Sequence, residues 1–425
     1  MLMLALRFFV YTVIVLIING CSGGEADYSL NDVYPTSHGK FIDEAVEGLE
    51  YTRSSDGTSL TGRGGHYEYK NGDLITFHVG ALELGTSSSG SILTPRELAV
   101  GASVIEDPKV SNRVRFLLAL DKNPKIGIQI DAATRKRAAT WSSSLDFDQS
   151  EADFALAVEV ATHGDVNASS LPSKSVADAH FARSLRCAYS GGYVGAWKVP
   201  GSNETTGFVG AMLQANGTVV VMGDGQTVND QDNSVIYVVG NHDINTKSYT
   251  FNPDVFYYYD RVQETLVDVT DGVSISGVGI NKTYDHINGS FVNGTQSGSY
   301  NVQRADASNN AAYRFTGFGW NTSGGFPIGM IIMDIDPNGK VSGLIHYIPD
   351  VSIQPQLHGT VDFVSGEVTI TVDAPDQNTL PLVSNVRGSI NFNNTSEESA
   401  LTWTTVEGSA LGSVKLDGCQ LQAID

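Results

Sequence analysis

Residues 328–343 read IGMIIMDIDPNGKVSG, and this segment sets the fold expected for more than half of the chain. An apolar run over residues 328–333 precedes the turn sequence Asp336-Pro337-Asn338-Gly339, and an apolar pattern resumes at Val341. Asn-Gly between two such runs is a strong signal for a β-hairpin. The segment therefore predicts two antiparallel strands joined by a tight turn.

The same pattern of short strands and turns continues through residues 187–425. Asn-Gly recurs at Asn216, Asn288 and Asn293, and runs rich in β-branched residues separate these turns at intervals of about ten residues. Such spacing is typical of a sandwich or a barrel. We expect an all-β antiparallel domain over residues 187–425, built either as one large pair of sheets or as two small barrels.

Residues 44–186 have a mixed pattern that predicts an α+β domain. Two alternating strands flank Asn71-Gly72, which predicts a hairpin. Thr94-Pro95-Arg96-Glu97 has the residues of a capping box with proline at the first helical position. Val110, Val114 and Leu117 share one face of a helix expected over residues 108–120. Because helical patterns stop near Arg186, we place the domain boundary there.

The N-terminus has the features of an export signal. Arg7 precedes an uncharged apolar run over residues 8–18, which ends in Ile18-Asn19-Gly20-Cys21. This ending resembles the lipobox of bacterial lipoproteins. The resemblance implies a signal peptide over residues 1–20 and diacylation of Cys21. The small, polar and turn-rich residues that follow predict a flexible, lipid-anchored tether over residues 21–43. Ser22 rather than Asp after the cysteine implies sorting to the outer membrane. Cleavage by the ordinary signal peptidase and retention as a membrane helix are the alternatives.

A second resemblance covers about a third of the chain. Residues 44–185 resemble a module of uncharacterised lipid-anchored proteins of Gram-negative bacteria. It implies an exported lipoprotein and no particular activity. The matching motifs are Gly48-Leu49-Glu50-Tyr51, residues 67–77, Leu84-Gly85, Leu93-Thr94-Pro95, residues 112–117 and residues 123–128.

Charge and cysteine content narrow the class of protein further. The formal net charge is −21, which argues against nucleic acid as a partner because such binding depends on Lys and Arg at the phosphates. Three cysteines suit an oxidising compartment. With Cys21 assigned to lipid, Cys187 and Cys419 are expected to form a disulfide between the first and last strands of the β domain. The alternative is two unpaired thiols.

No motif assigns a catalytic, cofactor-binding or metal-ligating residue. The sequence Asp334-Ile335-Asp336-Pro337-Asn338-Gly339 matches the start of a calcium loop, but Ile345 stands where the closing Glu would be, so a hairpin turn is the better interpretation. Tyr189, Tyr193 and Trp197, with residues 256–259, suggest either a platform for sugars or ordinary strand packing. We favour packing.

The sequence favours a non-catalytic outer-membrane lipoprotein that acts as a binding, adhesion or envelope-assembly module. Its lipid would hold it to the membrane, facing the periplasm or the cell surface, and its partner would be a glycan or a protein of the envelope. The alternative is a glycan-active hydrolase with a pair of carboxylates in a cleft of the β domain.

Overall fold

The computed structural model describes most of the chain after residue 35, and residues 36–425 form one compact unit. Among the residues that the structure describes, every α-helix ends before residue 190, and only strands follow. None of the described helices combines the length and the apolar character that a membrane span needs. The described residues are 36–122, 127–201, 206–226, 233–260, 265–268, 273–280, 286–293, 296–305, 310–321, 327–347, 354–373, 384–392, 395, 399–404 and 409–422.

Three small sheets occupy residues 36–129. Their strand orders are β5-β1-β8, β4-β3-β6-β7 and β2-β9. Short connections contain the 3₁₀ helix η2 (Arg63–Gly65). The strands are β1 Thr36–Phe41, β2 Val46–Glu47, β3 Glu50–Arg53, β4 Thr58–Leu60, β5 His66–Lys70, β6 Leu74–Val79, β7 Leu82–Ser88, β8 Ile92–Leu93 and β9 Ile128–Gln129.

The hairpin predicted across Asn71-Gly72 is wrong. The turn exists, with Gly72 at φ 92°, but β5 pairs with β1 whereas β6 pairs with β3 and β7. The reason lies in the side chains. Tyr67 of β5 and Phe77 of β6 are both buried, with ring centroids 5.7 Å apart. The two strands therefore meet through their side chains, in different sheets.

Five α-helices lie within the described residues before 190, and their starts follow the sequence closely. Thr94 Oγ1 accepts from the amide of Arg96, and Asp107 accepts from Lys109 ahead of the helix predicted over 108–120, which is confirmed. The 3₁₀ helix η3 (Ala168–Ser170) precedes α5. The helices are α1 Pro95–Leu98, α2 Pro108–Leu120, α3 Ala132–Ala138, α4 Glu151–Ala161 and α5 Lys174–Tyr189.

The switch from helix to strand comes later than predicted. Helix α5 continues through Cys187 to Tyr189, and the next strand begins at Gly191. Cys187 therefore does not open a strand, and the boundary drawn at Arg186 falls inside a helix. The sequence after Cys187 is rich in Gly and Tyr, so the last turn of the helix has no recognisable helical pattern. Separate folding of residues 44–186 stays a prediction.

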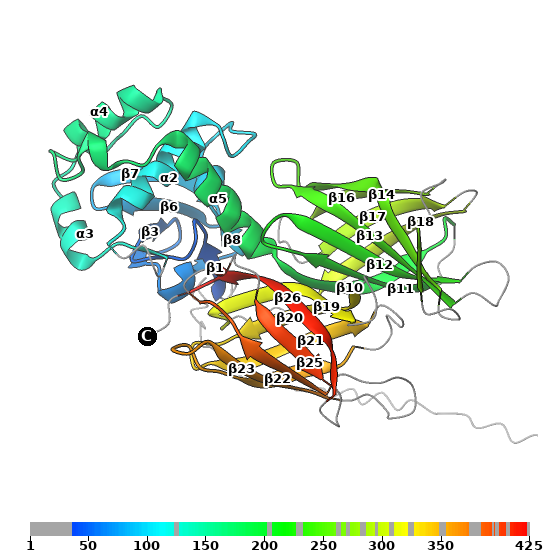
Figure 1. Ribbon diagram of the computed structural model, residues 1–425. Helices are drawn as coiled ribbons and strands as arrows, with labels where there is room; N and C mark the ends of the chain where they lie inside the picture. Colours follow the sequence, from blue (N-terminus) through cyan, green and yellow to red (C-terminus); the bar gives the residue numbers. More distant parts are fainter. Residues whose placement is uncertain are drawn as a thin grey trace, which may run out of the picture. The chain divides into compact units, whose positions relative to one another are not determined.

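Nine strands after α5 form a curled sheet, in the order β13-β12-β11-β10-β18-β17-β16-β14-β15 (Figure 1). Strand β14 pairs with β13 and, over two residue pairs, with β16, so the sheet curls back towards itself. We call it the curled sheet. Its strands are β10 Gly191–Lys198, β11 Gly207–Leu213, β12 Thr218–Gln226, β13 Asn233–Asp243, β14 Ser248–Asp260, β15 Thr265–Asp268, β16 Val273–Ile280, β17 His286–Asn293 and β18 Gln296–Arg304.

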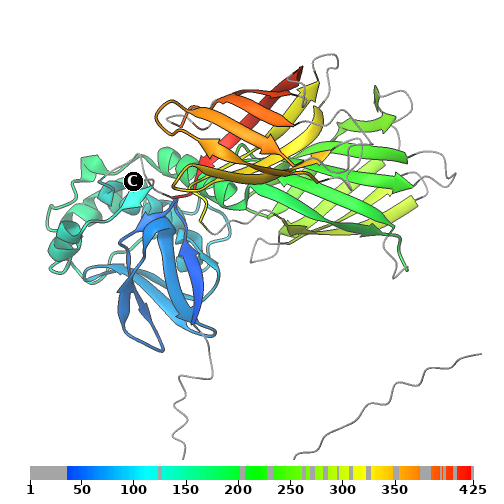
Figure 2. The ribbon, with the colours of Figure 1, turned by 90° about the horizontal axis from the view of Figure 1, so that it is seen from below.

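The remaining strands form a closed antiparallel barrel, coloured yellow to red in Figure 2. Each strand pairs with the next in the chain, and β19 pairs with β26 to close the ring. The predicted antiparallel β structure, left open as a sandwich or a barrel, is confirmed and takes the barrel form in β19 to β26, while strands β10 to β18 form the separate curled sheet. Its strands are β19 Tyr313–Asn321, β20 Pro327–Ile335, β21 Lys340–Tyr347, β22 Gln356–Val361, β23 Glu367–Val372, β24 Asn385–Ser389, β25 Ala400–Thr404 and β26 Ala410–Gln420.

Three large apolar cores lie among the described residues, besides a small cluster around Cys187 and Cys419. The first uses residues 41–171 alone. The second joins α2 and α5 to the curled sheet: Phe181 and Leu185 pack with Tyr193 and Val209. The third fills the closed barrel, where Trp403 is fully buried. Helix α5 thus serves the core of the curled sheet rather than the first core.

The outer face of the barrel packs against the curled sheet. A Cβ at Gly192 would meet Ile332 Cδ1 at 2.6 Å, and one at Gly210 would lie 3.7 Å from His346 Nδ1. The His346 side chain is buried in this contact, and its Nε2 has no hydrogen-bond partner. Burial lowers the pKa of His346 from 6.5 to about 4.

We expect His346 to make the fold sensitive to acid. Between pH 6.5 and 4 the unfolded chain binds a proton at this histidine and the native chain does not, so stability falls as the pH falls. From pH 7 to pH 5 the loss is about 2 kcal/mol. Urea unfolding of His346→Gln across this range should show a correspondingly smaller loss. The exposed His358→Gln should keep the parental pH profile; equal profiles for all three proteins would contradict the prediction.

Candidate functional site at the end of helix α5

Helix α5 carries an apolar stripe and a basic stripe. Ala177, Phe181 and Leu185, spaced four residues apart, are buried. His180 and Arg183, three residues apart, occupy another stripe with Arg186. Ser173 starts the helix by accepting from the amide of Val176. The apolar stripe fixes the helix on the curled sheet. The basic stripe therefore faces the last strand of the barrel at one end and the acidic residues Asp43 and Glu44 at the other.

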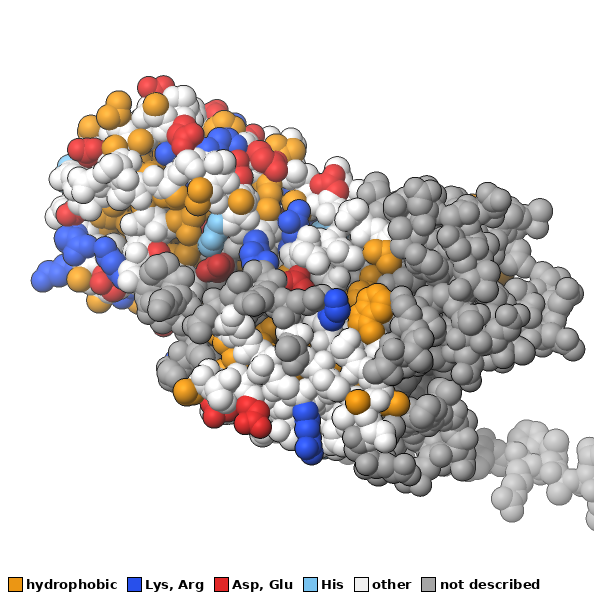
Figure 3. Space-filling view, in the orientation of Figure 1, with side chains coloured by type: hydrophobic (Ala, Val, Ile, Leu, Met, Phe, Trp, Pro, Cys, Tyr) orange, Lys and Arg blue, Asp and Glu red, His pale blue; other side chains and the backbone are white. Residues whose placement is uncertain are grey.

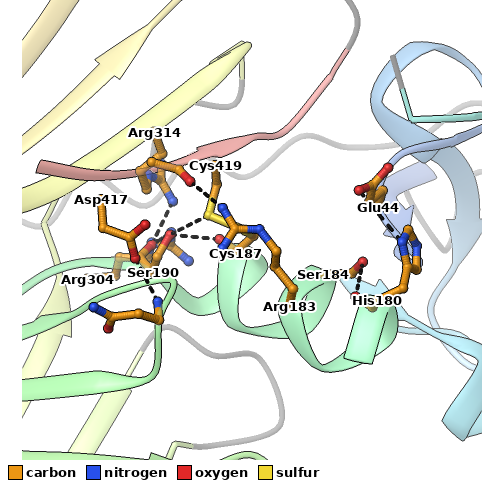
Figure 4. Close-up of a disulfide and its surroundings, with 12 residues drawn as sticks. Glu44, His180, Arg183, Ser184, Cys187, Ser190, Arg304, Arg314, Asp417 and Cys419 are labelled. Carbon is orange, nitrogen blue, oxygen red and sulfur yellow. Dashed lines mark hydrogen bonds and ion pairs between the residues drawn. A yellow bond between two sulfur atoms is a disulfide. The ribbon is translucent and has the colours of Figure 1, made fainter. Parts of the chain in front are cut away.

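A disulfide attaches the last turn of α5 to the last strand of the barrel (Figure 4). The Cα atoms of Cys187 and Cys419 are 5.5 Å apart, within the 4.4–6.8 Å that disulfides adopt. One turn earlier, Arg183 Nη2 donates to the Gly418 carbonyl at 3.0 Å. Burial raises the pKa of the neighbouring Asp417, and Arg183 partly offsets this. Cys419 lies in the last strand as predicted, whereas its partner lies in a helix.

Two arginines cap the C-terminal end of α5. Arg304 of β18 donates to the carbonyls of Ala188 and Ser190 at 3.1 and 2.6 Å, and Arg314 of β19 donates to Ser190 at 3.1 Å (Figure 4). The last carbonyls of a helix lack partners within it and carry partial negative charge, so cations there are favourable. The helix end is thus bound to the curled sheet and to the barrel together.

Arg314 also forms a buried ion pair. Its Nε and Nη2 each lie 2.7 Å from an oxygen of Asp334 on the adjacent strand β20. Both side chains are about 5% exposed or less. Two parallel hydrogen bonds to one carboxylate are the strongest arrangement for such a pair, and both residues come from the outer surface of the barrel facing α5.

A histidine and two acidic residues meet at the other end of this stripe. His180 Nε2 lies 3.3 Å from Asp43 Oδ1, and its Nδ1 lies 3.9 Å from Glu44 Oε1. Burial would lower the pKa of His180, but the buried carboxylate of Asp43 and then Glu44 raise it to about 9. Burial raises the pKa of Glu44, which the charge of His180 opposes. His180 is therefore charged at neutral pH and neutralises Asp43.

The structure also places the residues singled out from the sequence. Tyr189, Tyr193 and Trp197 are buried in the second core, so the packing interpretation is confirmed for them. The side chains of residues 256–259 lie outside those described, as does Cys21. Asp336 Oδ1 accepts from the amides of Asn338 and Lys340 in the turn between β20 and β21, as a hairpin turn requires. Over the described ranges, no three His, Cys, Asp or Glu side chains are grouped for a metal ion.

Comparisons with known proteins add little. Neither protein-family models nor curated protein sequences match this chain. Two solved structures are weakly similar. Kievitone hydratase from Nectria haematococca shares 8% identity over 54% of this chain and 89% of its own, with a TM-score of 0.22. A putative AttH from Nitrosomonas europaea shares 10% identity over 55% and 92%, with a TM-score of 0.17.

Proposed function

We propose that this protein is an exported lipoprotein, anchored through Cys21 to the outer membrane, that acts as a non-catalytic binding, adhesion or assembly module of the envelope. The observation that carries the proposal is the pairing of Cys187 with Cys419. Disulfides persist in the oxidising compartments outside the cytoplasm. The sequence Ile18-Asn19-Gly20-Cys21 supplies the anchor in this proposal.

The proposed arrangement has an α+β domain next to the tether and β structure beyond it. The first core supports this division, because all of its residues lie between 41 and 171. On the face seen in Figure 3, acidic, basic and apolar side chains are interspersed over this part of the chain. Such a mixed surface suits attachment through the lipid rather than through a basic patch.

A filled barrel supports binding at an outer surface. Apolar side chains from all eight strands form its core, and the ring of Phe392 packs edge-on against Tyr313 and Phe315. A barrel of eight strands is only just wide enough for side chains to fill. A glycan or protein of the envelope would therefore contact exposed strands, turns or helices rather than a lumen.

The alternative of a glycan-active hydrolase requires two carboxylates that face each other across a cleft. Within the described residues, the two carboxylates with raised pKa are Glu44 and Asp417. Glu44 lies against His180, and Asp417 accepts from the amide of Asn216 at 2.7 Å. Nothing in this arrangement favours the hydrolase over the binding module.

Replacement of the anchor cysteine tests the proposal. Cys21→Ser removes the sulfur that would carry the acyl chains, so the protein should leave the membrane fraction and become soluble after cell disruption. Ser22→Ala keeps the cysteine and should stay with outer membranes on a sucrose gradient. By the sorting rule that the lipobox resemblance implies, Ser22→Asp should move the protein to the inner membrane. Firm membrane association of Cys21→Ser would overturn the lipoprotein proposal.

A further inference from the structure

Strands β1 and β5 place three basic side chains on one face. Their register sets Lys40 opposite His66, and His38 stands two residues before Lys40 on the same strand. Residues directly opposite in an antiparallel pair point to the same side, as do residues two apart. The other face of the pair carries Gly39 and the buried Tyr67, so the basic face points away from the first core.

The acidic residues near this face are already engaged. Glu68, opposite His38, is half exposed and lies 3.6 Å from Arg53 on β3. Asp334 lies close enough to Lys40 to influence its charge. Both of its oxygens, however, accept from Arg314. In the part of the chain that the structure describes, no carboxylate lies within 4 Å of the Lys40 ammonium.

The basic groups repel one another. Burial lowers the pKa of Lys40, and the charge of Arg304 lowers it further while Asp334 opposes this. Burial likewise lowers the pKa of His66, followed by the charges of Lys40 and His38. Basic groups whose protonation is weakened by neighbouring positive charges lie in a region of positive potential. Such a region attracts an anion.

We propose that Lys40, His66 and His38 form a binding site for a phosphate-type oxyanion, with Arg304 contributing positive charge from the end of α5. An ammonium and two imidazole rings supply N–H donors for the oxygens of such a group. Arg304 directs its guanidinium nitrogens to the α5 carbonyls, so its part is electrostatic. The site lies where β1, β5, α5 and the barrel meet, a usual place for ligands, and it goes beyond the proposed function.

The anion would be either free or carried by a larger molecule. In an envelope protein the two main sources are a small phosphomonoester and the phosphodiester of an anionic lipid headgroup. Both present non-bridging phosphate oxygens to Lys40 and His66, so the structure identifies the chemistry and not the source. Glycerol 3-phosphate and glycerophosphoglycerol are soluble probes of the two sources.

Thermal unfolding of the full-length protein in detergent, at constant pH and ionic strength, tests the site. Replacing chloride by 100 mM inorganic phosphate should raise the Tm by about 3 °C, the shift expected for a millimolar site. Lys40→Met should have two opposite effects. In chloride it should raise the Tm, because a repelling charge is gone, and it should abolish the response to phosphate. His66→Gln should weaken the affinity for phosphate about tenfold, which shows as a smaller rise in Tm.

Lys70→Met is the matched control, because Lys70 shares the strand and the face of His66 but pairs with Thr36. It should respond to phosphate like the parent protein. The stronger of the two glycerol probes identifies the source. A parent protein that does not respond to phosphate or sulfate overturns the site. The site is also overturned if the Tm of Lys40→Met still rises in phosphate, or if its Tm in chloride is lower than that of the parent.

Discussion

Replacing Arg314 with leucine is expected to lower the free energy of unfolding by about 3–5 kcal/mol. The change leaves the Asp334 carboxylate in the contact between α5 and the barrel without the two hydrogen bonds that now compensate its burial. It also removes a donor from the Ser190 carbonyl at the end of α5. Urea unfolding of the two proteins at pH 7 measures the difference.

The double variant Arg314→Leu with Asp334→Leu separates a lost attraction from an orphaned charge. Removing both partners leaves no unpaired member of this ion pair, so it should recover much of the stability that the single variant loses. Arg387, exposed on β24, provides the matched control. Arg387→Leu should change stability by less than about 0.5 kcal/mol. A single variant as stable as the parent would contradict the role assigned to this ion pair.

The local elements of this fold follow from the sequence, because their signals lie within a few residues. Asp107 and Pro108 mark the start of α2, and Asn338-Gly339 marks the turn between β20 and β21. The partners of strands are a different matter. The turn at Gly72 is correct, but burial of Tyr67 and Phe77 in a common core places β5 and β6 in different sheets. Long-range packing decides which strands pair, and a local sequence pattern carries no information about it.

The candidate site shows the same limit more strongly. Lys40, His180 and the two arginines Arg304 and Arg314 come from three distant parts of the sequence, and none belongs to a recognisable motif. Asp334 gives the one available signal, a charge at the end of the apolar run 328–333. Such a charge suggests a specific partner, because an unpaired carboxylate is costly to bury. The identity of that partner depends on β19 lying beside β20, which only the assembled barrel supplies.

The disulfide illustrates a correct pairing reached by an incomplete argument. The prediction placed both cysteines in strands at the two ends of one closed domain. In the structure the closed barrel begins at β19, so its first strand follows Cys187 by more than a hundred residues. Cys187 instead reaches Cys419 from the end of α5. The bridge therefore joins the helix to the barrel, alongside the contacts of Arg183 and Arg314.

Removing this bridge is expected to cost about 2–5 kcal/mol of unfolding free energy. The cysteines are 232 residues apart, and the chain-entropy model gives roughly 5 kcal/mol for a loop of that size. Urea unfolding of Cys187→Ala with Cys419→Ala, in the Cys21→Ser background and without reductant, measures the loss. The parent protein in reductant is the control and should approach the double variant. Two free thiols in the exported protein, or equal stability of variant and parent, would show that the bridge does not stabilise the fold.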